Sequence, residues 1–189
     1  MKRDDLRAFL AEKPYDAMVL TSEISRRYAT GFHSTAGAVY LSAKQAVFFT
    51  DFRYVEAARA AVSDFEVREI KAGQSYSALI NELIDTDGAK KIALEDKTLT
   101  YAEFMSWSTT LHGTAVRLED GVESLRIMKE DTEVEKIVAA QRIAEQALEE
   151  VLNDIKVGVT EKEIAARLTY LMLHYGAENM SFDPIVVSG

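Results

Sequence analysis

Short apolar runs alternate with segments of helical spacing along the first 118 residues, and this alternation restricts the chain to a layered α/β fold. The runs predicted as strands are residues 17–21, 36–43, 45–51, 65–70, 91–95 and 115–118. The segments predicted as helices are residues 3–12, 54–62, 75–85 and one that begins at Thr100. Residues 36–51 read as a hairpin, so the sequence predicts a mixed sheet flanked by helices.

Two local patterns support individual elements of this prediction. Residues 65–70 strictly alternate apolar and polar side chains, which is typical of a half-buried strand. Thr100 and Glu103 have capping-box spacing, in which each side chain satisfies an exposed backbone N–H of the other residue. The pattern places a helix start at Thr100.

The character of the chain changes near residue 120. Residues 132–156 predict one long charged helix with a capping box at Thr132 and Glu135, and Thr160 and Glu163 open a second helix that runs to about Tyr175. Residues 185–188 predict a terminal strand. We therefore expect two domains, residues 1–122 and 123–189.

The second of these domains looks incomplete. Two amphipathic helices and one strand, about 64 residues from position 126 onward, would struggle to complete a core. A lone strand also needs a partner in a sheet. Either this strand pairs with the sheet of the first domain, or the chain is a fragment of a longer protein. We expect that the chain is a fragment.

Composition excludes several classes of function. The formal net charge is −9, which argues against nucleic-acid and anionic-membrane partners, because both recruit Lys and Arg. The chain has no cysteine, so disulfides, thiolate nucleophiles and Cys-ligated metals are excluded. No apolar run reaches a membrane span, and no signal peptide is visible. The expected location is cytoplasmic.

The residues taken alone do not specify a catalytic site. His33, His112 and His174 lie far apart, and none has a second ligand at metal-binding spacing. His112 and His174 are expected at helix ends, where a solvated structural role is favoured. No nucleophile, phosphate-loop or dinucleotide motif is present. We expect no tightly bound metal in this chain.

An ordered set of local patterns nevertheless resembles a known family. The segments Tyr-Ala-Thr-Gly-Phe at 28–32 and Thr-Asp-Phe-Arg-Tyr at 50–54 are similar to the N-terminal domain of the creatinase/prolidase group. Downstream segments resemble the start of that group's pita-bread catalytic domain: residues 125–130, 133–137 with Ala144, 158–165, 176–177 and 181–189. The resemblance covers the whole chain in order and spacing.

The resemblance implies an Xaa-Pro aminopeptidase or Xaa-Pro dipeptidase. In that family two Asp, one His and two Glu hold two divalent ions, often manganese or cobalt, and a bridging hydroxide attacks the peptide bond before proline. All five ligands would lie beyond Gly189. The resemblance therefore implies no catalytic and no metal residue in this chain, which should be inert without the remainder.

Two residues carry over as candidate substrate contacts. Phe182 and Ile185 match family positions that line the apolar substrate pocket, and the alternative is that both are ordinary core of a buried strand. The implied ligands are proline-containing peptides. The implied assembly is a homodimer in which the first domain contacts a neighbouring subunit.

Other aromatic and charged residues of the matching motifs are expected to be structural. Asp51 is predicted to cap the following helix by accepting backbone N–H bonds, and Arg53 to pair with a carboxylate. Tyr28 and Phe32 are predicted to pack rather than to recognise a ligand.

Two alternatives of the same fold remain open. One is a non-catalytic peptide- or protein-binding module, as in a histone chaperone subunit, and the other is creatinase itself, which cleaves a guanidino compound without metals. The encoded residues after Gly189 would discriminate them. A Pro-His motif followed by two Asp would indicate the metallopeptidase.

Overall fold

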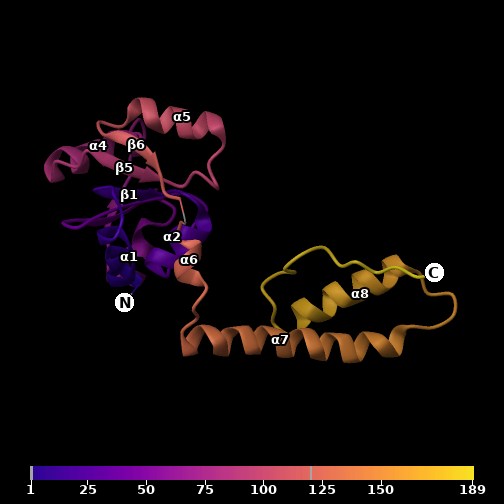
Figure 1. Ribbon diagram of the computed structural model, residues 1–189. Coiled ribbons are helices and arrows are strands. Elements are labelled where there is room, and N and C mark those ends of the chain that lie inside the picture. The colour runs from indigo at the N-terminus through magenta and orange to yellow at the C-terminus, as the bar shows by residue number, and fades with distance from the viewer. Residues whose placement is uncertain (1, 120) are drawn as a thin grey trace. The chain divides into compact units, whose positions relative to one another are not determined.

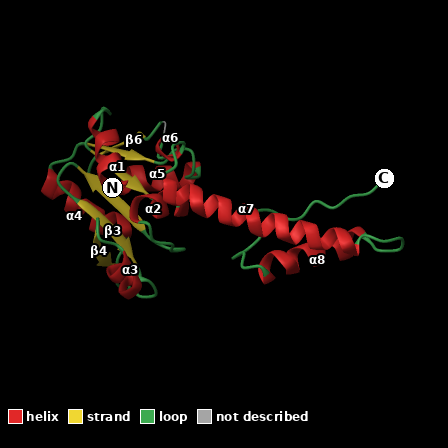
Figure 2. Ribbon diagram, turned by 90° about the horizontal axis from the view of Figure 1, so that it is seen from below, coloured by secondary structure: helices red, strands yellow, loops and turns green. Residues whose placement is uncertain are grey.

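The computed structural model describes residues 2–119 and 121–189. The chain divides into two compact units, Met1–Ile127 and Met128–Gly189, which are described separately below. Unit 1 contains a sheet with helices on both faces, and unit 2 consists of helices and an irregular terminal segment (Figures 1 and 2).

The sheet of unit 1 has six strands in the order β4-β3-β2-β1-β5-β6. The strands are β1 (Ala17–Leu20), β2 (Ala38–Ser42), β3 (Ala46–Thr50), β4 (Glu66–Glu69), β5 (Lys91–Leu94) and β6 (Thr114–Arg117). The predicted hairpin is β2 and β3, and β2 also pairs antiparallel with β1. The remaining pairs are parallel. The prediction of an α/β fold with a mixed sheet is confirmed.

Two layers of helices cover the sheet. The helices of unit 1 are α1 (Lys2–Ala11), α2 (Glu23–Thr30), α3 (Val55–Ala61), α4 (Tyr76–Asp87), α5 (Tyr101–Thr110) and α6 (Glu123–Arg126). Helices α1, α2 and α3 share one core with Met18 and Leu20, whereas α4 and α5 share another with Ala17 and Val19. Alternate residues of β1 thus point to opposite faces, and every residue of β1 is buried.

Helix α2 was not predicted, although its ends carry ordinary signals. The Ser22 hydroxyl accepts a hydrogen bond from the Ser25 N–H, and Gly31 ends the helix with φ +70°. Its buried residues are Ser25, Arg26 and Ala29, which do not form an apolar stripe. Hydrophobic periodicity therefore does not predict a helix at residues 23–30.

Unit 2 is an antiparallel helical hairpin (Figures 1 and 2) made by α7 (Asp131–Val151), the short 3₁₀ helix η1 (Leu152–Asp154) and α8 (Glu161–His174). The predicted capping box of Thr160 with Glu163 is confirmed. The box predicted at Thr132 and Glu135 is wrong, because α7 begins earlier. Its N-cap is Glu130, whose N–H donates to the Glu133 carboxylate at 3.0 Å.

The predicted strand at residues 185–188 is also wrong. The segment after α8 has neither helix nor strand in the described chain, and the Ser188 N–H and hydroxyl instead donate to Glu161 Oε1. A strand is defined by its ladder of hydrogen bonds to a neighbour, and unit 2 has no other strand to supply one. None of the described helices is long and apolar enough to cross a bilayer.

Candidate functional site

The carboxyl edge of the sheet in unit 1 gathers the polar loops of this fold. Strands β1, β3, β4, β5 and β6 all end at this edge, and β2 begins there. In open α/β sheets, ligands bind in the crevice outside the carboxyl ends of the strands. The loop at 31–37 and the segment at 50–54 both lie at this edge, so a ligand site is expected here.

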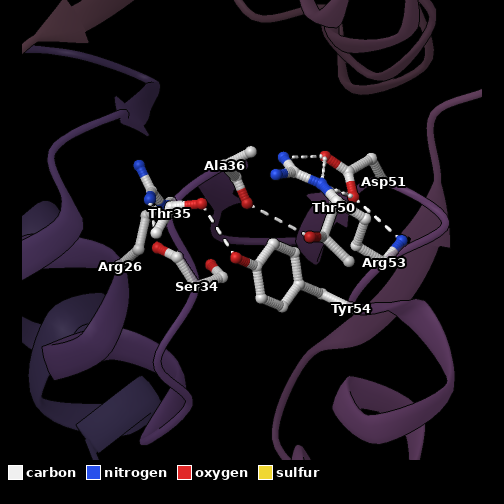
Figure 3. Close-up of polar contacts among 8 residues, drawn as sticks. All are labelled: Arg26, Ser34, Thr35, Ala36, Thr50, Asp51, Arg53 and Tyr54. Atoms are coloured by element: carbon white, nitrogen blue, oxygen red, sulfur yellow. Dashed lines mark hydrogen bonds and ion pairs between the residues drawn. The ribbon is translucent and has the colours of Figure 1, made fainter.

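Arg26 is a buried cation, with 4% of its surface exposed. Its guanidinium donates to two backbone carbonyl oxygens, that of Thr21 and, at 2.7 Å, that of Ser34. Burial lowers the pKa of Arg26, because the charged form loses water. The side chain joins the loop after β1 to the loop before β2, and it lies beside the latter in Figure 3.

Glu95 fixes the start of α2 from the end of β5. It is 6% exposed, and its carboxylate accepts hydrogen bonds from the N–H groups of Thr21 and Ser22 and from the Ser22 hydroxyl. Ser22 is the N-cap of α2 and Thr21 precedes it, so the carboxylate lies at a helix N-terminus, where negative charge is stabilised. Arg26 and Glu95 therefore hold the loop after β1 in one position.

Asp51 and Arg53 form a close ion pair directly after β3. The Arg53 Nη2 and Asp51 Oδ2 are 2.6 Å apart, and Asp51 Oδ1 also accepts the Arg53 backbone N–H at 3.0 Å. The Arg53 guanidinium is the main reason why the pKa of Asp51 lies below its ordinary value. The prediction that Arg53 pairs with a carboxylate is confirmed.

Asp51 does not cap α3 as predicted. The N-cap of α3 is Tyr54, and the Asp51 carbonyl oxygen accepts the N–H groups of Tyr54 and Val55 at 3.0 Å. The Asp51 side chain is turned to Arg53 instead, because a tight turn separates β3 from the helix. Asp51 therefore stabilises the turn and presents Arg53, whose side chain is half exposed.

Tyr54 ties this turn to the loop before β2. Its hydroxyl lies 2.8 Å from the Thr35 hydroxyl, and the Thr50 hydroxyl donates to the Ala36 carbonyl oxygen at 3.1 Å (Figure 3). The Phe32 ring meets the Tyr54 ring edge to face at 6.4 Å. Tyr28 and Phe32 pack against the core, so their predicted packing role is confirmed.

A pocket of about 260 Å³ opens at the same edge. It lies between the start of α2 and α5, and its lining includes Ser22, Gly37, Tyr76 and Trp107. Gly37 permits the close approach of this loop to β3, because a Cβ atom there would lie 2.7 Å from the Phe49 carbonyl oxygen. The edge offers hydrogen-bonding and aromatic groups to a ligand.

The histidines take separate local roles. His33 Nε2 lies 2.7 Å from Glu23 Oε1, and His112 Nδ1 lies 3.0 Å from the Asp85 carboxylate. His174 stacks on Tyr170 in unit 2. Within residues 2–119 and 121–189, no three His, Asp or Glu side chains come together as a possible metal site.

The predicted substrate residues lie in the irregular segment after α8. Phe182 is 71% exposed and Ile185 is 82% exposed. Their role in a substrate pocket stays a prediction. The sequence did not predict the buried roles of Arg26 and Glu95. Glu95 is the last residue of a predicted strand and Arg26 lies in the polar stretch after another, and charged residues are common at such positions.

Comparisons with known proteins match both parts of the chain. The family Creatinase/Prolidase N-terminal domain matches residues 2–128, and Metallopeptidase family M24 matches residues 135–189. A Bacillus subtilis protein named Uncharacterized peptidase YqhT is 34% identical over 190 residues, which cover 100% of this chain and 53% of that protein.

Solved structures agree with this assignment. An Xaa-Pro dipeptidase from Bacillus anthracis superposes with a TM-score of 0.89 at 35% identity, over 96% of this chain and 51% of that one. An X-Pro aminopeptidase from Thermotoga maritima gives a TM-score of 0.84 at 31% identity, over 97% and 51%. The chain thus spans about half the length of the relatives it matches. The resemblance seen in the sequence is confirmed, and the chain belongs to the creatinase/prolidase family.

Proposed function

We propose that this chain is the N-terminal portion of a proline-specific metallopeptidase that hydrolyses the Xaa-Pro peptide bond. The family assignment and the names of relatives, such as the Xaa-Pro dipeptidase of Pyrococcus furiosus, support this substrate class. In this proposal residues 1–122 are the N-terminal domain, and residues 123–189 open the pita-bread catalytic domain.

The exposed apolar surface of unit 2 carries the proposal. Only Ala147, Val151 and Leu171 are buried apolar residues among the described residues of this unit. Large apolar side chains remain more than one-third exposed along both helices and the terminal segment: Val134, Ile137, Val138, Leu148, Leu152, Ile155, Tyr170, Leu173, Phe182, Ile185 and Val187. A surface of this kind marks an interaction site, and we assign it to the rest of a catalytic domain.

Family M24 implies divalent metal ions in the full-length relatives, and we propose two, manganese or cobalt. The described residues of this chain do not fit such a site, because no three carboxylate or imidazole side chains converge. We therefore derive no catalytic step within this chain and propose that it is inactive alone. In the complete protein, Phe182 and Ile185 of this chain would provide apolar contacts to the substrate.

Unit 1 has a separate role in the proposal. We assign it to subunit contact in a homodimer and to control of access to the catalytic site. Two exposed apolar side chains at or near the carboxyl edge, Ile24 and Phe52, fit such a contact, since they are 57% and 77% exposed. We also propose a cytoplasmic location, which is the default for a chain of this composition.

The test compares the complete protein with the 189-residue chain. Both are assayed on Xaa-Pro dipeptides and longer Xaa-Pro peptides, with and without added manganese or cobalt. Metal-dependent cleavage by the complete protein alone is expected. If the complete protein binds these peptides and never cleaves them, the non-catalytic module is the correct alternative. Cleavage by the short chain would contradict its proposed inactivity.

A further inference from the structure

A second pocket lies in unit 1 at the end of the sheet opposite to the carboxyl edge. It has a volume of about 350 Å³ and is lined by the end of α1, the turn before β1, the β2–β3 turn and the end of α4. This volume falls within the usual range for small-molecule sites. None of the family motifs discussed above lies in it.

Three cations line this pocket: Arg7, Lys13 and Lys44. Among the described residues, no carboxylate lies within salt-bridge distance of the Arg7 guanidinium or the Lys44 ammonium group. The Arg7 Nε donates to the Ser42 carbonyl oxygen at 3.4 Å, a long hydrogen bond, and Lys44 Nζ donates to the Asp87 carbonyl oxygen at 2.8 Å. The Arg7 guanidinium keeps further donors that this bond does not use.

Two carboxylates line the same pocket, but neutral groups satisfy them. Asp87 accepts hydrogen bonds from the Tyr40 and Ser42 hydroxyls and from the Gln45 amide, and Asp16 accepts two backbone N–H groups. Lys13 Nζ lies over the Phe9 ring at 5.0 Å. Arg7 and Lys44 are therefore the two cations of this pocket that we consider for binding an anion, in a chain whose formal charge is −9.

We propose that this pocket binds the phosphate group of a small organic molecule. A phosphate presents three acceptor oxygens and up to two negative charges, so it can accept hydrogen bonds from both the Arg7 guanidinium and the Lys44 ammonium group, whereas a carboxylate presents two oxygens and one charge. Leu10 and Tyr15 form an apolar wall that would contact the organic part. The site is independent of the peptidase proposal, because it uses no residue of that proposal.

The test is a calorimetric titration of the 189-residue chain with inorganic phosphate and with phenyl phosphate. Saturable binding of both is expected, with phenyl phosphate the tighter ligand because of the apolar wall. The double variant Arg7→Gln, Lys44→Gln should weaken binding about tenfold or more. The control Arg59→Gln, Lys71→Gln removes the same charge elsewhere in unit 1 and should bind like the parent chain.

Thermal unfolding of each variant establishes that it is folded. The single variant Lys44→Gln, in an exposed turn, serves if the double variant is unstable, and it should also weaken binding. The proposal is overturned if phosphate does not bind saturably, or if the control weakens binding as much as the pocket variants do.

Discussion

The two units of this chain differ in how completely they bury their own apolar surface. In unit 1 the strands β1 and β2 are buried at every residue, and helices cover both faces of the sheet. In unit 2 two helices bury three apolar residues between them and leave about half of their large apolar side chains exposed. Unit 1 therefore has the core of an independent domain, whereas the small core of unit 2 supports the proposal that further protein covers its helices.

The core of unit 1 should be the part of the chain most sensitive to substitution. Phe48 is fully buried in β3, so Phe48→Ala should lower the free energy of unfolding of unit 1 by about 3–5 kcal/mol. The matched variant in unit 2 is Ile137→Ala, whose side chain is 55% exposed and should cost less than about 0.5 kcal/mol. Urea unfolding of both variants measures the contrast, and equal losses would refute the comparison.

The second prediction concerns the buried cation. Arg26→Met leaves the carbonyl oxygens of Thr21 and Ser34 without their charged donor, so stability should fall by about 1.5–3 kcal/mol. Arg27→Met removes an exposed arginine from the same helix and should have a much smaller effect. Thermal unfolding provides the measurement. If Arg26→Met is as stable as the parent chain, the guanidinium does not hold the loops of the carboxyl edge.

A third prediction concerns acid stability, which should involve Asp87. Burial alone would raise the pKa of Asp87, but hydrogen bonds from Ser42, Gln45 and Tyr40 outweigh it, and the pKa lies below its ordinary value of 3.8. The folded state therefore favours the ionised form. Its stabilisation is present above pH 3.8 and is lost as the pH falls through the lower folded-state pKa.

Asp87→Asn should abolish this contribution, so the variant should be less stable at pH 7 and should lose less stability on acidification. Glu12→Gln, at an exposed position, is the control. Unfolding free energies measured between pH 7 and the acid limit of folding test the prediction. An unchanged pH profile in Asp87→Asn would contradict it.

The last prediction concerns the ion pairs of unit 2. Arg167 on α8 pairs with Glu150 and Asp154 at 2.6 and 3.0 Å, but these side chains are about 40% exposed. Arg167→Gln should therefore destabilise the helical hairpin only slightly, because water screens an exposed ion pair. Helix content followed by circular dichroism at low and high salt measures it. A large loss would mean that this ion cluster, rather than further protein, stabilises unit 2.

The sequence was sufficient for elements with a strong local signal. The strands, most helices and the Thr100 and Thr160 capping boxes follow from periodicity and from side chains that bond to nearby backbone. Helix α2 was missed because its buried face contains Ser25 and Arg26 instead of apolar residues.

Features that depend on distant contacts could not be predicted. The burial of Arg26 and Glu95 arises from loops that meet only in the folded sheet. The strand at 185–188 was predicted from its apolar residues, but a strand needs a partner that local sequence cannot supply. The contacts of Arg26 and Glu95 at the carboxyl edge therefore follow only from the structure, whereas the pairing of Arg53 with a carboxylate was predicted from the sequence.

Amide hydrogen exchange, measured on the 189-residue chain and on the complete protein under the same conditions, tests whether unit 2 depends on further protein. We predict that the amides of α7 and α8 exchange about a hundredfold more slowly in the complete protein, because further protein would cover their exposed apolar faces. The exchange rates of the amides in the strands of unit 1 should differ far less between the two proteins. Equal protection of α7 and α8 in the two proteins would contradict the claim that unit 2 depends on the remainder of a catalytic domain.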